Sequence, residues 1–303
     1  MYDYVVAGEG AAGCVLASRL TSSSDVKVLL LEAGPPDTDP YIHMPVGFYK
    51  MTSGPLVWNY KIAPQRHANN REIPFAQGRV LGGGSSINAM VFTRGQPQDF
   101  DRWANEDGCA GWSFNDILPY YRKSEDNDRL SGPYHGNGGP LGVSDLISPS
   151  ELAKAFVRAC QEAGIPYNPD FNGPKQEGCG FYQVSQRNGR RSSAVEYLLQ
   201  GRGRPNLTVQ TRCFATKIRI ENGRSVGVEC RRGSSKQTKF APAERETLIA
   251  NGAIGSPKLT AAERMMELGF MPLASLKDRP AVRWVRFQSF SEPLGALAGR
   301  WGI

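Results

Sequence analysis

The stretch YDYVVAGEGAAGCVLASRL, residues 2–20, constrains the fold more than any other part of the chain. Asp3 to Ala7 predicts a short strand, Ala11 to Leu20 predicts a helix, and the aliphatic run from Val26 to Leu31 predicts a buried strand. Strand, glycine turn, helix, strand is the setting in which G-x-G-x-x-G binds a dinucleotide. The sequence therefore predicts an α/β fold with a Rossmann-like nucleotide-binding domain.

Each glycine of this motif has a physical task. Gly8 permits the tight turn, Gly10 lets the backbone approach a pyrophosphate, and Gly13 lets the helix pack closely on the strand. The free N–H groups at the helix N-terminus then face the phosphates. Glu32 ends the second strand, where a carboxylate accepts hydrogen bonds from the adenosine ribose and repels a 2′-phosphate. A glycine turn without a ligand is the alternative.

Glu9 stands between the first two glycines and is unusual there, because a carboxylate aimed at a pyrophosphate would repel it. At this position the backbone makes the phosphate contact. We therefore expect the Glu9 side chain to point away, toward solvent or a basic partner.

A second glycine-rich segment reads GRVLGGGSSINAMVFTRG, residues 78–95. Three consecutive glycines around Gly83, followed by two serines, form a loop that can lie against a flat or anionic ligand, because few side chains hold it off. A flexible linker is the alternative, and the apolar flanks of the loop disfavour it.

With these two segments the chain resembles the glucose-methanol-choline (GMC) oxidoreductases, and among them the choline and alcohol dehydrogenase branch. Further segments that carry the resemblance are LLLEAG (29–34), IHMPVG (42–47), WNY (58–60), DFDRW (99–103), GWSFNDILPYY (111–121), NLTV (206–209) and GAIGSP (252–257). The resemblance covers roughly residues 2–259, and its segment 78–101 is highly specific.

This resemblance implies FAD as cofactor and the oxidation of an alcohol CH–OH group by hydride transfer to flavin N5. It implies that Gly8, Gly10, Ala12 and Gly13 contact the pyrophosphate, and Glu32 and Ala33 the adenosine ribose. It places Val80, Gly83 and the run Asn88, Ala89, Met90, Val91 along the flavin and pyrophosphate, and Ala215 at the adenine. Partners implied for an active enzyme are a small-molecule alcohol and an electron acceptor; the sequence selects neither the alcohol nor oxygen over a quinone-type carrier.

The resemblance also implies a division of the chain. Residues 1–259 correspond to the N-terminal FAD-binding region, with nucleotide-binding segments at about 1–40, 78–95 and 205–259 and parts of an α+β substrate domain between them. Residues 260–303 depart from the family pattern, and we interpret them as a divergent or truncated tail that lacks the C-terminal half of the family fold.

Several local patterns extend this layout. Strands are expected over 206–210, 213–220, 225–230 and 246–250, and helices over 114–123 and 151–163. Ser193 and Glu196 form a plausible capping box for a short helix. The aromatic residues Trp58, Tyr60, Trp103, Trp112, Tyr120 and Tyr121 are interpreted as core.

Alcohol oxidation needs a proton acceptor, and a histidine suits that task. The resemblance implies that His43 lies near the substrate side of the flavin as a structural residue. His67 and His135 lie in turn-rich loops and are expected at the surface. The resemblance implies a catalytic histidine beyond an H-P-x-G-T-like segment, which residues 260–303 do not contain. No catalytic residue is therefore identified. The alternative to an active FAD-dependent dehydrogenase is an inactive FAD-binding remnant, and an NAD-dependent Rossmann enzyme is less favoured.

Composition disfavours other functions. The net charge is +7, but basic pairs such as Arg190-Arg191 are dispersed and read as solvated charge, so nucleic acid is not an expected partner. The six cysteines form no C-x-x-C pair and have no histidine at ligand spacing; buried thiols are expected, and no metal site. We expect no membrane span and no signal peptide, and thus a cytoplasmic protein.

Overall fold

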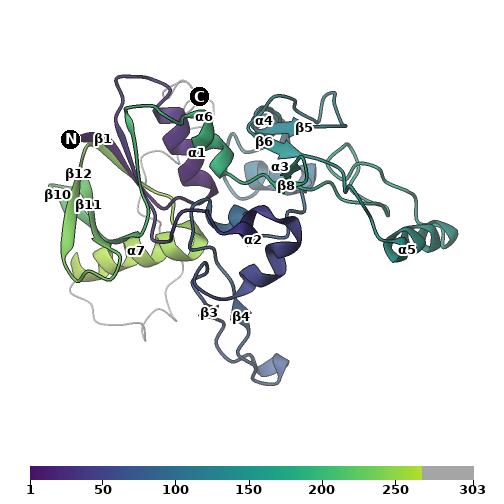
Figure 1. The fold of residues 1–303 in the computed structure, drawn as a ribbon, viewed down its shortest axis with the longest axis horizontal. Helices are drawn as coiled ribbons and strands as arrows, with labels where there is room; N and C mark the ends of the chain where they lie inside the picture. The colour runs from purple at the N-terminus through teal and green to yellow at the C-terminus, as the bar shows by residue number, and fades with distance from the viewer. Residues whose placement is uncertain (268–303) are drawn as a thin grey trace. The chain divides into compact units, whose positions relative to one another are not determined.

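The computed structural model describes residues 1–267 of the chain, which form two compact units (Figure 1). The first unit, here the nucleotide unit, comprises Met1–Ala89 and the described chain from Arg190 onward. The second comprises Met90–Gly189. The chain thus leaves the nucleotide unit after the second glycine loop and returns to it 100 residues later.

A six-stranded mixed sheet forms the centre of the nucleotide unit, in the order β10-β11-β12-β1-β2-β9. The strands β12 (Thr238–Ile249), β1 (Tyr2–Ala7), β2 (Val28–Leu31) and β9 (Leu207–Gln210) are parallel neighbours. The strands β10 (Cys213–Glu221), β11 (Arg224–Arg232) and β12 continue the sheet as antiparallel neighbours. All four residues of β2 are buried, as expected for a parallel strand covered on both faces.

Two helices of this unit follow strands of the sheet, and a third packs against one of them. Helix α1 (Ala11–Leu20) begins directly after β1 and the glycine turn, and buries Gly13, Cys14 and Ala17. Helix α6 (Val195–Gln200) packs against α1, and α7 (Gly252–Glu267) follows β12 (Figure 1). The remaining short elements of this unit are α2 (Pro40–His43), η1 (Pro45–Thr52), β3 (Tyr60–Lys61), η2 (Arg66–Ala68), β4 (Pro74–Phe75), η3 (Gly83–Ser86) and β8 (Arg190–Arg191).

The second unit has a small aromatic core and a buried polar network. Helices α3 (Pro97–Asn105) and α4 (Phe114–Ser124) pack through Phe100, Phe114 and Ile117. The remaining elements are β5 (Glu125–Asn127), parallel to β6 (Leu141–Val143), helix α5 (Glu151–Glu162) and β7 (Gln186–Arg187).

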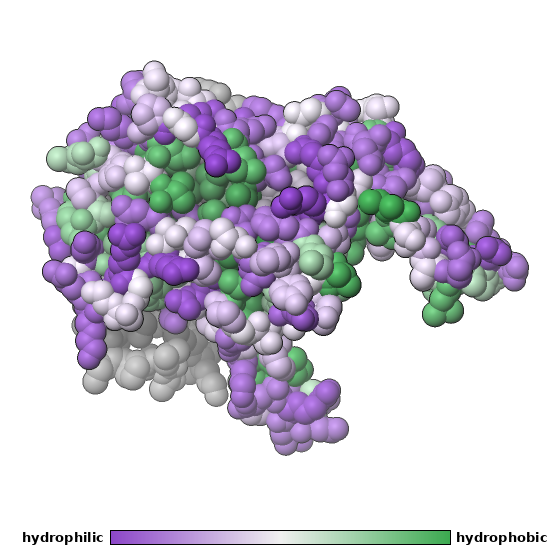
Figure 2. All heavy atoms as spheres, viewed as in Figure 1, coloured by the Kyte–Doolittle hydropathy of each residue, from purple (hydrophilic) through white to green (hydrophobic). Residues whose placement is uncertain are grey.

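Helix α5 leaves large apolar side chains at the surface: Leu152 is 81% and Phe156 68% exposed. Figure 2 shows apolar atoms among polar ones over this part of the surface.

In the polar network, His135 lies between two carboxylates. Its Nδ1 is 2.9 Å from Glu125 Oε1 and its Nε2 is 2.9 Å from Asp170 Oδ2. Arg94 donates to the other Glu125 oxygen and, over 2.6 Å, to Tyr134 O. His135 is only 4% exposed, so the expectation of a surface histidine is wrong: the loop around it is rich in turns but folds over its side chain.

The expected α/β fold and the strands and helices named from the sequence are confirmed, with boundaries shifted by at most eight residues. The capping box is wrong. Helix α6 has Ala194 as its N-cap without a side-chain hydrogen bond, while Ser193 Oγ accepts from Val195 N at 3.3 Å. Most of the expected tail, from residue 268 onward, lies outside the described residues. No helix in the described part of the chain is long and apolar enough to span a membrane.

Candidate functional site

A cavity of about 720 Å³ lies in the nucleotide unit, at the C-terminal ends of the parallel strands β1 and β2. This is where open α/β sheets bind ligands, and the volume is in the range of small-molecule and cofactor sites. Its lining includes these residues proposed from the sequence: Gly8, Gly10, Ala12, Glu32, Ala33, Gly83 and Ala215. Segments distant in sequence thus meet at one cavity.

Two glycines of the first motif are required by the protein itself. Gly8 has φ +99°, and a Cβ there would lie 2.6 Å from Ala250 O. A Cβ on Gly13 would lie 1.9 Å from Gly8 O, because α1 packs directly against the turn. A side chain at either position is therefore incompatible with this turn.

Gly10 differs from these two, because a Cβ on it would meet only Ala250 O, at 3.7 Å. The protein has space for a side chain at Gly10, but that side chain would extend into the cavity. Gly83 belongs to the second glycine loop, and a Cβ on it would lie 2.8 Å from the Cα of Gly10. The two glycine loops therefore touch, backbone against backbone, at the wall of the cavity.

The N-terminus of α1 opens toward this wall. Gly10, the N-cap residue, supplies no side-chain cap, and the first turn has no acidic residue. Gly10, Ala11 and Ala12 all line the cavity. Uncapped N–H groups together with the helix dipole favour a phosphate at this point.

Glu32 lies at the C-terminal end of β2 with its carboxylate fixed by the backbone. Its Oε1 accepts from Gly34 N at 2.6 Å and its Oε2 from Glu9 N at 3.1 Å. Burial raises the pKa of Glu32, while these backbone N–H groups act in the opposite direction. Each carboxylate oxygen can accept further hydrogen bonds, so Glu32 fits a ribose diol.

Glu9 does not point to solvent, contrary to the expectation from the sequence. It is completely buried, and neither carboxyl oxygen has a hydrogen-bond partner. Burial, followed by the charges of Glu32 and Asp37, raises the pKa of Glu9 to about 9. The expectation failed because the second glycine loop covers this position: Gly82 N donates to Glu9 O at 2.8 Å. At neutral pH Glu9 is a neutral acid, and it therefore does not repel a phosphate.

An aromatic wall of the cavity was not identified from the sequence. Trp58 and Tyr60, interpreted there as core, both line the cavity with Phe214. The Trp58 and Tyr60 rings stack with centroids 6.1 Å apart, and Trp58 meets Phe214 at 5.7 Å. Phe214 adjoins Ala215, the residue for which the resemblance implies a contact with adenine. The core interpretation does hold for Trp112 and Tyr121 of the second unit.

The other predicted cofactor residues do not line the cavity. Val80 is fully buried in a cluster with Ile42, Met51 and Leu56. Asn88 and Ala89 end the first segment of the nucleotide unit, and Met90 and Val91 belong to the second unit. There Met90 is buried and Val91 forms an isolated bridge with Val184.

None of the three histidines of the chain, all within the described residues, lines the cavity. His43 Nε2 is 2.7 Å from Asp37 O, His67 is exposed as expected, and His135 is held in the polar network of the second unit. The described residues therefore bring no histidine base to this site.

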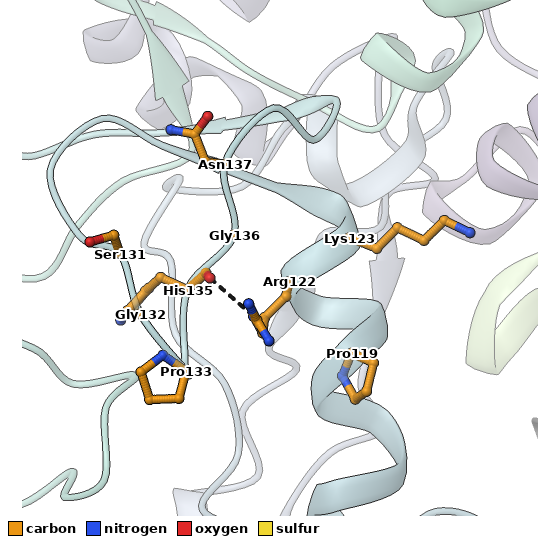
Figure 3. Close-up of a pocket in the computed structure, with 9 residues that line it drawn as sticks. All are labelled: Pro119, Arg122, Lys123, Ser131, Gly132, Pro133, His135, Gly136 and Asn137. Atoms are coloured by element: carbon orange, nitrogen blue, oxygen red, sulfur yellow. Dashed lines mark hydrogen bonds between the residues drawn. The ribbon is translucent and has the colours of Figure 1, made fainter.

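A second cavity, of about 660 Å³, lies in the second unit beside α4 (Figure 3). Arg122 Nε donates to His135 O at 3.2 Å across it, and Lys123 points away from the cavity. Arg122 is thus already bonded to the backbone, and the His135 side chain, which also borders this cavity, is held by Glu125 and Asp170. We regard this cavity as a surface cleft, and the first one as the candidate site.

The sequence of the chain is similar to that of known oxidoreductases. The GMC oxidoreductase family profile matches residues 2–262. An alcohol dehydrogenase (acceptor) of Pseudomonas putida is 42% identical over 92% of this chain and 50% of its own length. An oxygen-dependent choline dehydrogenase of Sinorhizobium fredii is 41% identical over 91% of this chain and 49% of its own length.

Solved structures give the same result. Pyridoxine 4-oxidase from Mesorbium loti superimposes with a TM-score of 0.80 at 32% identity, over 85% of this chain and 50% of that structure. An FAD-dependent oxidoreductase from Chaetomium thermophilum gives a TM-score of 0.81 at 29% identity, over 89% and 50%. The chain thus spans about half the length of the relatives it matches. It belongs to the GMC oxidoreductase family.

Proposed function

We propose that the chain binds FAD in the cavity of the nucleotide unit. The observation that carries this proposal is the meeting of the two glycine loops at Gly10 and Gly83, on the wall of a cavity that Glu32 also lines. The loops offer backbone N–H groups to a pyrophosphate, and the fixed carboxylate of Glu32 offers acceptors to a ribose. A nicotinamide dinucleotide would need only the first loop.

In the proposed complex the residues of the chain bind and orient the cofactor. The α1 N-terminus and both glycine loops hold the diphosphate, Glu32 accepts hydrogen bonds from the ribose, and Trp58 with Phe214 flanks the adenine. The neutral state of Glu9 keeps negative charge away from the diphosphate. When bound, the flavin would supply the hydride acceptor for oxidation of an alcohol carbon, the reaction class that the names of the relatives indicate.

We propose oxidation of the CH–OH group of a small-molecule alcohol as the activity, with an electron acceptor as the second substrate. The alternative is an FAD-binding protein without turnover. It is favoured by one observation: no histidine among the described residues reaches the cavity.

Two measurements test these proposals. The purified chain, reconstituted with FAD and desalted, should retain a yellow cofactor that denaturation releases; a colourless protein would refute FAD binding. Anaerobic mixing of the loaded protein with choline and with aliphatic and aromatic alcohols then separates the alternatives. Bleaching of the flavin absorbance supports the oxidoreductase, and an unchanged spectrum with every alcohol supports the inactive form.

A further inference from the structure

Arg191, at the end of β8, is a buried cation next to the candidate site. It is 5% exposed, although the sequence suggested a solvated charge for the pair Arg190-Arg191. Burial lowers its pKa to about 10, which leaves the guanidinium protonated at neutral pH. No ion pair of the described residues involves it. A buried charge without a counter-charge is costly, so its retention calls for an explanation.

The guanidinium joins three segments of the nucleotide unit through neutral oxygens. Its Nε donates to Ile42 O at 2.7 Å, and its Nη1 donates to Ser85 O at 3.1 Å. Both Nη1 and Nη2 donate to Asn88, to Oδ1 at 2.6 Å and to the backbone O at 2.7 Å. The planar fork of arginine suits this pattern, and the single ammonium of lysine cannot reproduce it.

These contacts fix the loop that leads from the cavity to Asn88. Gly83 and Gly84 line the cavity and belong, with Ser85, to η3, which ends two residues before Asn88. The hydrogen bond to Oδ1 orients the Asn88 amide with its oxygen toward Arg191 and its NH₂ end away from it. Arg191 itself does not line the cavity, so any effect on a ligand passes through this loop.

We propose that Arg191 is a positioning residue for the flavin half of the cofactor. It holds Ser85 to Asn88, the part of the loop beyond the glycines that hold the diphosphate, in the shape that receives the flavin. The adenosine half is left to Glu32 and Trp58. This inference rests on the proposed binding of FAD.

The test compares FAD with ADP, which carries only the adenosine and diphosphate half. Dissociation constants of both are measured by calorimetry for the wild-type chain, Arg191→Met and Arg191→Lys, with Arg190→Met as the control. Arg190 is the exposed neighbour of Arg191. We expect Arg191→Met to weaken FAD binding at least tenfold and ADP binding less than about threefold, with Arg190→Met unchanged. Arg191→Lys should recover less than half of the loss, because it restores the charge and not the fork.

Retained ADP binding shows that a variant is folded, so loss of FAD binding is then not a consequence of unfolding. If Arg191→Met binds FAD as tightly as Arg190→Met, the inference is wrong. Equal loss of FAD and ADP binding would also overturn it, because a general structural role predicts equal loss. A wild-type chain that binds ADP but not FAD would instead refute the proposed function, and this inference with it.

Discussion

Glu9 and Glu32 are joined by a backbone hydrogen bond, in which Glu9 N donates to Glu32 Oε2 at 3.1 Å. The carboxyl group of Glu9 itself is completely buried and has no hydrogen-bond partner. Two acidic side chains thus lie close together at the glycine turn, and only Glu32 has donors to stabilise its charge. Glu9 avoids the conflict by keeping its proton, with a pKa raised to about 9.

The first prediction concerns the pH dependence of stability that Glu9 imposes. The pKa is raised in the folded state, so between about pH 4.5 and 9 the unfolded chain ionises while the folded chain keeps its proton. Stability therefore falls as pH rises across this window, by at most about 1.4 kcal/mol per pH unit. Glu9→Gln removes this ionisable group. The urea midpoint of the variant minus that of wild type should therefore be larger at pH 8 than at pH 6.

The control for this comparison is Glu221→Gln, an exposed acid of the same unit. Its midpoint relative to wild type should be the same at both pH values. A Glu9→Gln difference that is also independent of pH would show that Glu9 is ionised in the folded protein.

How far the sequence predicts this site depends on the kind of interaction. Gly8, Gly13 and Glu32 could be placed because turn sterics and strand order are local properties of β1, α1 and β2. The burial of Glu9 and Arg191 could not be predicted, because a loop 70 to 110 residues away in sequence covers them. For the same reason Trp58 was assigned to a core: its neighbour in the cavity wall, Phe214, belongs to β10.

The second prediction concerns recognition of the ribose by Glu32. Glu32→Gln loses one acceptor and the negative charge, and we expect FAD affinity to fall at least tenfold, about 1.4 kcal/mol. Because the carboxylate repels a 2′-phosphate, wild type should bind ADP more tightly than adenosine 2′,5′-bisphosphate. The ratio of the two affinities should be smaller in Glu32→Gln than in wild type, and it should be unchanged in Glu221→Gln. An unaltered ratio in Glu32→Gln would place the ribose elsewhere.

The third prediction concerns the aromatic wall. Trp58→Ala should weaken ADP binding about tenfold, because stacking of a base on an aromatic ring contributes about 1–3 kcal/mol. Trp58→Phe keeps a ring and should stay within about threefold of wild type. Titration with ADP should quench tryptophan fluorescence in wild type and in the control Trp103→Phe, whose ring is 39% exposed in the other unit. Quenching that persists in Trp58→Phe would mean that the base does not contact Trp58.

The fourth prediction concerns the polar network of the second unit. Burial lowers the pKa of His135, but hydrogen bonds and ion pairs with Asp170 and Glu125 outweigh it and raise this pKa to about 9. The folded-state pKa lies above the usual value of 6.5, so the stabilisation is fully present below pH 6.5 and is lost as pH rises through about 9.

Replacing His135 with leucine leaves Asp170 without its cation and Glu125 with Arg94 alone, and should cost about 3 kcal/mol at pH 6. Urea denaturation of His135→Leu, followed by circular dichroism, should therefore differ from wild type most at pH 6 and least at pH 9.5. His67→Asn, at an exposed site, should match wild type at both values. If His135→Leu is destabilised equally at pH 6 and pH 9.5, the imidazole stabilises the unit by packing and not by its charge.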